Sequence, residues 1–284
     1  MPATDPSGFI TTAPPDVPGW VRCFDIDALP VLAETAESLE MLRGIEDRVD
    51  AHMLAEAVSA DPLMTLKLLS HVARHRRSRD PDSRSETETV TASLVMLGIG
   101  PFFRAFGPQS TVEAALADHP EALAGFRAVL KRSHRAANFA MSFAVHRMDH
   151  DVAVIHEAAL LHDFAELLLW LRAPALAGEI ARLQQDDPTL RSAALQRSLL
   201  HVELADLQHA LMLAWKLPSL LVHISDDRHA EQAQVRNVLL AIRVARHSAA
   251  GWDNPALPDD VADIADLLRL GLDPVWTLLR DIDA

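Results

Sequence analysis

The chain has 284 residues, 49% of them hydrophobic, which is enough to bury the core of one large domain or two smaller ones. Its 26 basic and 40 acidic residues give a net charge of −14 at pH 7, which disfavours non-specific binding to nucleic acid or to an anionic membrane surface. A single cysteine, Cys23, excludes an intramolecular disulfide and a cysteine-rich zinc site.

The composition favours helices over strands. The chain contains no Tyr and only ten Gly, so strand formers and hairpin turns are sparse. We therefore predict an all-α protein whose two halves join near residues 107–120. From hydrophobic spacing we expect helices near residues 32–43, 50–58, 90–97, 101–106, 122–147, 153–171, 175–185, 188–200, 203–215, 218–225, 230–249, 258–270 and 274–282.

The first residues, 1–24, are expected to form a loose amino-terminal arm, because Pro14, Pro15 and Pro18 oppose a helix. Trp20 and Phe24 could fix the end of this arm to the body. The arm lacks the basic and apolar regions of a signal peptide, and no apolar run reaches the ~18 residues of a membrane span. We expect a cytoplasmic protein that does not enter the membrane.

A further helix is expected to start at Pro62, with Asp61 as its N-cap. Residues 74–88 then interrupt the apolar pattern with arginines and are expected to form a polar loop. One interpretation of this loop is a phosphate or nucleic-acid patch. We favour a solvated loop, because acidic residues are mixed in and no aromatic residues interleave. The arginines in question are Arg74, Arg76, Arg77, Arg79 and Arg84.

One pair of adjacent residues is notable within the apolar helix expected over residues 153–171. His162 and Asp163 offer an imidazole nitrogen and a carboxylate oxygen from one backbone step. Such a pair holds a divalent metal when further ligands converge on it. The interpretation without a metal is a buried histidine bonded to a backbone carbonyl and a carboxylate held by a helix cap or a salt bridge.

Several short segments carry a family resemblance. They are Leu29-Pro30-Val31-Leu32, Asp61-Pro62-Leu63, Lys67-Leu68-Leu69, Ala92-Ser93-Leu94-Val95-Met96-Leu97-Gly98, Leu160-Leu161-His162-Asp163 and Trp215-Lys216-Leu217-Pro218. In this order they resemble the HDOD family, bacterial signalling proteins related to HD-type metal phosphohydrolases. The resemblance covers residues from about 29 to about 249. It implies two packed helical bundles, an amino-terminal helical subdomain over residues 25–107 and an HD-like core over residues 120–284.

An HD hydrolase surrounds one metal with an earlier His, the His-Asp pair and a later Asp. On the resemblance, the earlier position falls on His134 or Ser133, the pair is His162 and Asp163, and the later position falls on Arg246. An arginine stays protonated and cannot bind a metal, but its guanidinium can pair with a carboxylate. We therefore expect no metal and no cofactor, and an ion pair between Asp163 and Arg246 in place of the cation.

The resemblance and this altered site predict a non-catalytic regulatory protein. It would contact a signalling protein in trans, and a receiver or a cyclic-dinucleotide enzyme are the candidate partners. The alternative is an atypical metal-dependent phosphohydrolase acting on a nucleotide or a cyclic dinucleotide. In that case His134, His162 and Asp163 would bind the metal with a further ligand from His229 or a neighbour. A nucleic-acid binder using the arginines of residues 74–84 is the weakest hypothesis, because the chain is acidic.

Overall fold

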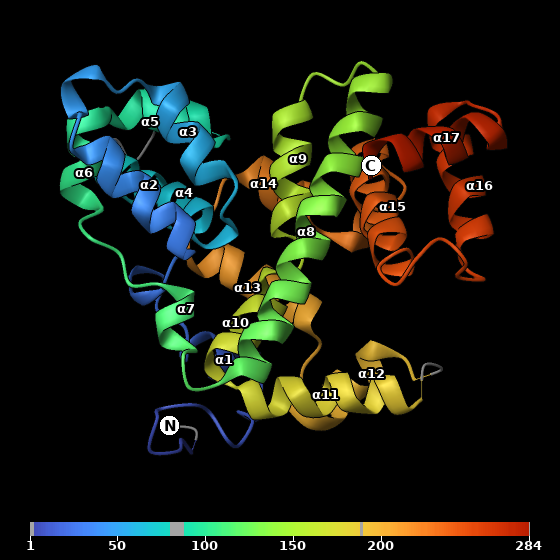
Figure 1. The fold of residues 1–284 in the computed structure, drawn as a ribbon, viewed down its shortest axis with the longest axis horizontal. Helices are drawn as coiled ribbons and strands as arrows, with labels where there is room; N and C mark the ends of the chain where they lie inside the picture. The colour runs from blue at the N-terminus through green and yellow to red at the C-terminus, as the bar shows by residue number, and fades with distance from the viewer. Residues whose placement is uncertain (1–2, 80–87, 188–189, 284) are drawn as a thin grey trace. The chain divides into compact units, whose positions relative to one another are not determined.

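The computed structural model describes residues 3–79, 88–187 and 190–283, and of residues 76–79 only the backbone. Within these ranges the regular elements are all helices, and the only strand-like pairings are two isolated β-bridges (Figure 1). The all-α prediction is therefore confirmed. The chain divides into two compact units, one made of residues 1–129 and 163–218 and the other of residues 130–162 and 219–284. The units interleave along the chain, and the contiguous domains 25–107 and 120–284 stay a prediction.

After the amino-terminal segment, the first unit continues with a series of helices, most of which contribute side chains to one apolar core. They are α2 (Ala33–Arg43), α3 (Ala51–Ser59), α4 (Pro62–Arg79), α5 (Val90–Leu97), α6 (Ile99–Ala105) and α7 (Val112–Ala115). Helix α3 contacts α2, α4 and α5, and α5 also contacts α4 and α6. Leu54, Leu68 and Phe102 are fully buried within this core. Apolar residues at helical spacing fall on one face of each helix, and these faces pack together to form the common core.

The predicted cap of α4 is present and has a second role. One Asp61 carboxylate oxygen accepts hydrogen bonds from the backbone N–H groups of Leu63, at 2.8 Å, and Met64, at 3.1 Å. The other oxygen accepts from the N–H of Leu32, at 2.7 Å. Asp61 is completely buried. A single carboxylate therefore joins the start of α4 to the segment that leads into α2.

The expected loop over residues 74–88 is partly wrong. Helix α4 continues to Arg79, so residues 74–79 are helical. Arginine is a good helix former, and Pro81 is the first residue that opposes the helix. Arg84 and the rest of residues 80–87 lie outside the described residues.

The amino-terminal segment is packed against the unit, whereas the sequence suggested a loose arm. Helix α1 (Val17–Val21) starts at Asp16, whose side chain accepts from the N–H of Gly19 at 2.7 Å. Pro18 lies in the first turn, where no backbone donor is needed. The Trp20 ring is fully buried and donates through Nε1 to the carbonyl of Leu200 at 2.9 Å. One buried indole with a satisfied N–H anchors this segment.

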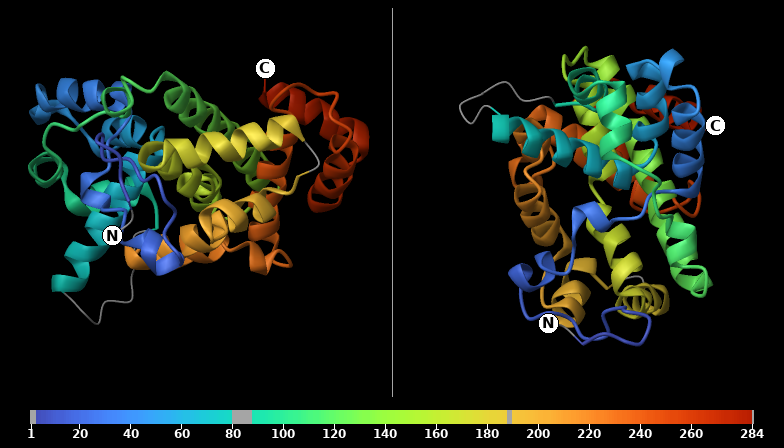
Figure 2. Two further views of the ribbon diagram at one scale, coloured as in Figure 1. Left: turned by 90° about the horizontal axis from the view of Figure 1, so that it is seen from below. Right: turned by 90° about the vertical axis from the view of Figure 1, so that its left-hand side faces the viewer.

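The remainder of the first unit comprises the start of α8 (Pro120–His146), α10 (Phe164–Arg172), α11 (Pro174–Asp186), α12 (Ser192–Leu200) and α13 (Leu204–Ala214). Helix α10 contacts α11 and α13, α11 contacts α12, and α13 contacts α1 (Figure 2). Gly125 of α8 lies directly against the Trp170 ring of α10. Helix α12 begins at Ser192, later than expected, and residues 188–189 lie outside the described residues.

The second unit contains the rest of α8, α9 (Val152–Leu161), α14 (Ser219–Ile224), η3 (Asp227–His229), α15 (Ala233–His247), α16 (Leu257–Leu268) and α17 (Leu272–Ile282). Helix α15 contacts α9, α14, η3 and α16, and α16 also contacts α17. Arg135 of α8 holds the Asp283 carboxylate with two N–H groups, at 2.6 and 2.8 Å. This ion pair fixes the carboxyl end of α17 to α8. No helix in the described ranges is long and apolar enough to cross a membrane.

The expected single helix over residues 153–171 is wrong. Helix α9 ends at Leu161 and α10 begins at Phe164, so the His-Asp pair forms the break between two helices. Both helices are buried on almost every side, and their apolar pattern therefore runs on without interruption. Neither Gly nor Pro marks the break.

Candidate functional site

His162 lies directly after α9, and its ring is already bonded to a carboxylate. The Nε2 atom is 3.0 Å from Oδ1 of Asp227, which belongs to η3 in the same unit. Asp226 caps η3 by accepting from the N–H of Arg228 at 3.2 Å, and so positions Asp227. The His162 side chain is only 10% exposed, whereas that of Asp227 is 43% exposed. The Nε2 atom of a nearly buried imidazole is thus engaged by an acidic side chain.

Asp163 and Arg246, which were predicted to form an ion pair, differ in their exposure to solvent. Asp163 is buried at the start of α10, and Arg246 is exposed in the last turn of α15. The ion pair between Asp163 and Arg246 stays a prediction. A buried carboxylate needs hydrogen bonds or a charge partner, so the reason for expecting a partner holds.

The earlier ligand position also stays open between Ser133 and His134 of α8. The Ser133 hydroxyl is buried and has no hydrogen-bond partner among the described residues. His134 lies close enough to His156 of α9 to influence it electrostatically. The pKa of His156 is lowered, mainly because the ring is buried and secondly because of His134. His156 therefore stays neutral, a feature that the sequence analysis did not identify.

His229, the suggested additional ligand, lies in η3. Its ring nitrogens are 3.8 Å from Asp226 and 3.6 Å from Glu231, and its ring lies 5.1 Å from that of His223. These contacts belong to the surface of η3 and α14, and none of them involves His162.

The side chains at the HD-related positions do not fit a divalent metal. In the described part of the chain, no three His, Cys, Asp or Glu side chains gather with a geometry that could hold one. His162 is bonded to Asp227, and the other two ligand positions, as the resemblance assigns them, carry a serine or histidine and an arginine. Because an HD hydrolase needs converging anionic and imidazole ligands, we derive no chemical step through a metal at this position.

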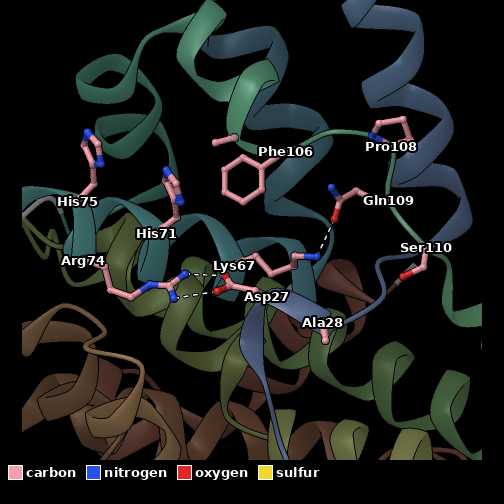
Figure 3. Close-up of a pocket in the computed structure, with 11 residues that line it drawn as sticks. Asp27, Ala28, Lys67, His71, Arg74, His75, Phe106, Pro108, Gln109 and Ser110 are labelled. Carbon is pink, nitrogen blue, oxygen red and sulfur yellow. Dashed lines mark hydrogen bonds and ion pairs between the residues drawn. The ribbon is translucent and has the colours of Figure 1, made fainter.

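A second candidate site is a pocket of about 670 Å³ within the first unit. Figure 3 shows Lys67, His71, Arg74 and His75 projecting from α4, with Phe106 and Gln109 facing them from the segment after α6. Arg74 forms a two-bonded ion pair with Asp27, at 2.6 and 2.9 Å. The sequence analysis placed Arg74 in a solvated loop and did not identify this pocket.

Lys67 forms the base of this pocket and is almost completely buried. Its Nζ donates to the carbonyl of Leu29 at 2.7 Å and to Oε1 of Gln109 at 2.6 Å. The Gln109 amide nitrogen donates in turn to the carbonyl of Gly107 at 2.7 Å. Burial lowers the pKa of Lys67, and the nearby carboxylates of Asp27, Asp61 and Asp25 oppose this effect. A lysine within the apolar run of α4 was the available sequence signal.

The two neighbours of Lys67 differ in charge. The pKa of Asp27 is lowered by its bond with Arg74, so Asp27 stays ionised. Burial lowers the pKa of His71, and the positive charge of Arg74 adds to this effect. His71 is therefore a neutral ring with one donor and one acceptor. The pocket combines two cations, one carboxylate and a neutral imidazole.

The fold is shared with solved structures of other bacterial proteins. The chain is 18% identical to the MmoQ response regulator from Methylococcus capsulatus, with a TM-score of 0.67 over 90% of this chain and 98% of that one. It is 20% identical to a virulence factor from Campylobacter jejuni, with a TM-score of 0.64 over 88% of this chain and 86% of that one. At these identities the likeness concerns the fold alone. A comparison with curated proteins finds no match.

The HDOD domain model matches residues 29–231, which is more than half of the chain. The protein therefore belongs to the HDOD domain family. The resemblance inferred from the sequence is confirmed.

Proposed function

We propose that this protein is a non-catalytic regulatory protein of signal transduction that acts through contacts with other proteins. The observation that carries the proposal is the bond between His162 and Asp227. This bond engages the ring that would bind a metal in an HD hydrolase. In addition, the position that the resemblance assigns to the later Asp ligand is occupied by Arg246. Membership of the HDOD family and the fold shared with a response regulator support a signalling role.

The partner in this proposal is a signalling protein in trans, and a receiver or a cyclic-dinucleotide enzyme are the candidate classes. A contact surface is available on α8 and the turn after it. Met141 and Val145 are 41% and 60% exposed and lie one turn apart on α8, and Met148, in the turn after the helix, is 83% exposed. Neighbouring exposed apolar side chains are typical of protein contact sites. Val145→Glu is expected to weaken binding to the partner, with unchanged helical content by circular dichroism.

The alternative, a metal-dependent phosphohydrolase, is tested by elemental analysis of protein purified without chelator or nickel resin. We expect far less than one equivalent of iron, manganese or zinc per chain, and no hydrolysis of bis(p-nitrophenyl) phosphate with added manganese. About one equivalent of metal that is lost in Asp163→Ala, together with turnover lost in the same variant, would overturn the proposal. His150→Ala, which changes an exposed histidine of the turn before α9, is the matched control.

A further inference from the structure

The lining of the pocket on α4 carries two cations and one carboxylate in a protein with a net charge of −14. Lys67 and Arg74 are two cations about two helical turns apart, and both line the pocket. Ser110 and the His71 ring add neutral hydrogen-bonding groups around the same space (Figure 3). An ammonium ion buried as deeply as that of Lys67 is costly unless it has anionic or dipolar partners. The pocket is thus polarised toward an anion.

Both cations retain donors for such an anion. Lys67 has three N–H donors, and among the described residues Leu29 and Gln109 accept from two of them. Arg74 has five N–H donors and uses two of them on Asp27. The guanidinium fork that holds the Asp27 carboxylate has the geometry that also binds a phosphate group with two bonds.

Asp27 behaves as an internal competitor for that fork. Its side chain is 65% exposed and belongs to the short helix η1 (Ile26–Ala28), so it can leave Arg74 for water at little cost. With Asp27 paired, Lys67, Arg74 and Asp27 together carry a net charge of about +1, which the nearby carboxylates of Asp25 and Asp61 reduce further. With Asp27 displaced, the two cations match the charge of about −2 on a phosphate monoester.

An apolar wall lies on the opposite side of the pocket. Phe106 contributes its ring, which meets the His71 ring edge-on at 5.1 Å between centroids, and Ala105 and Pro108 flank it. A bare inorganic ion would leave the exposed parts of this wall, Ala105 and Pro108, in contact with water, whereas Phe106 is only 6% exposed. A planar organic group attached to the phosphate would cover the wall and bury apolar surface.

From this arrangement we propose that the pocket lined by Lys67, His71, Arg74 and Phe106 binds a small organic phosphate monoester. Arg74 and Lys67 hold the phosphate, and Phe106 packs against the organic group. Asp27 occupies the Arg74 fork in the absence of the ligand. This inference concerns the first unit alone and stands whether or not the proposed signalling role is correct.

Isothermal titration calorimetry at low ionic strength tests the inference, with adenosine 5′-monophosphate, adenosine and inorganic phosphate as probes. We expect saturable binding of the nucleotide, weaker binding of inorganic phosphate and none of adenosine. Arg74→Gln removes a charge-assisted pair of bonds and is expected to weaken nucleotide binding roughly tenfold. Asp27→Asn removes the competitor and is expected to strengthen nucleotide binding by about threefold or more. Opposite effects from the two members of one ion pair cannot arise from general damage to the fold.

Arg182→Gln is the matched control, because Arg182 is an exposed arginine of α11 paired with Glu179 and Asp186 in the same unit. It is expected to leave binding unchanged. The inference is overturned if neither phosphate probe binds, if adenosine binds as well as its monophosphate, or if Arg74→Gln and Arg182→Gln have equal effects. Inorganic phosphate binding as tightly as the nucleotide would overturn the role of Phe106.

Discussion

Gly125 allows α8 to approach α10 closely, and replacing it with alanine is expected to destabilise the first unit. A Cβ atom at this position would lie 2.4 Å from Cζ2 of Trp170 and 2.5 Å from Cε2. Carbon atoms in contact are normally about 3.5–4.0 Å apart, so the indole would have to retreat by roughly 1 Å. Trp170 is buried and has a rigid ring, so the movement must pass to its neighbours.

The size of the effect follows from two opposing contributions. Overpacking of this kind costs typically about 1–3 kcal/mol, and a contact this short places Gly125→Ala toward the upper end. Alanine in a helix interior is favoured over glycine by roughly 0.5–1 kcal/mol, which offsets part of that cost. We expect a net loss of about 1–2 kcal/mol for Gly125→Ala. At Gly178 of α11 no atom lies within 4 Å of the added Cβ, so Gly178→Ala gains roughly 0.5–1 kcal/mol.

Urea denaturation followed by circular dichroism at 222 nm measures both variants against the parent protein. The midpoint is expected to fall for Gly125→Ala and to rise for Gly178→Ala, although the chemical change is the same. In the background Trp170→Leu, the Gly125→Ala change is expected to become neutral or stabilising, because the smaller side chain leaves room for the methyl group. Equal midpoints for the two alanine variants, or an unchanged penalty in the Trp170→Leu background, would refute the reasoning.

Three further predictions concern buried polar groups. Asp61→Ala removes the acceptor of three backbone N–H groups and should lower the free energy of unfolding by about 3 kcal/mol. Asp50→Ala, which removes the exposed cap of α3, should lower it by only about 1 kcal/mol in the same denaturation assay. The pKa of His156 in the folded protein lies below its unfolded value of 6.5. Between these two pKa values the unfolded chain binds more protons than the folded protein, so stability is lost as the pH falls below about 6.5. His156→Gln should therefore reduce the loss of stability between pH 7 and 5, and the exposed-site variant His150→Gln should not; parallel pH curves for all three proteins would contradict this. Arg246→Ala should lower the melting temperature if the predicted ion pair with the buried carboxylate of the His-Asp pair forms, and an unchanged melting temperature counts against the pair.

Local signals in the sequence were sufficient to predict the bounds of helices that have capping residues at both ends. Helix α5 spans residues 90–97 as expected, because the Thr89 hydroxyl accepts from the N–H of Ala92 at 3.2 Å and Gly98 adopts a φ of 84°. These are capping interactions between residues close in sequence, so a pattern of residue types reveals them. The break between α9 and α10 has no such signal, because it falls at His162 and Asp163 within a continuously apolar run.

The contacts that define both candidate sites join residues far apart in sequence. His162 meets Asp227 across 65 positions, and Arg74 meets Asp27 across 47. Neither the composition nor the spacing of the sequence around such an aspartate identifies it as the partner of a particular histidine or arginine. The sequence therefore indicated which residue types occupy the HD-related positions, but it could not indicate what those residues contact in the folded chain.

Packing contributes more to the stability of the second unit than the contact made by His162. The His162 and Asp227 pair includes a carboxylate that is 43% exposed, and such pairs contribute at most about 1 kcal/mol. The aromatic side chains of the same unit, such as Phe139 and Phe143 of α8, are fully buried, and burying one such side chain contributes roughly 1.5–3 kcal/mol. A substitution at His162 is therefore expected to cost the fold little, provided that the new side chain satisfies its polar groups within the packed unit. The helices would then keep the surfaces and pockets through which we propose that the protein acts.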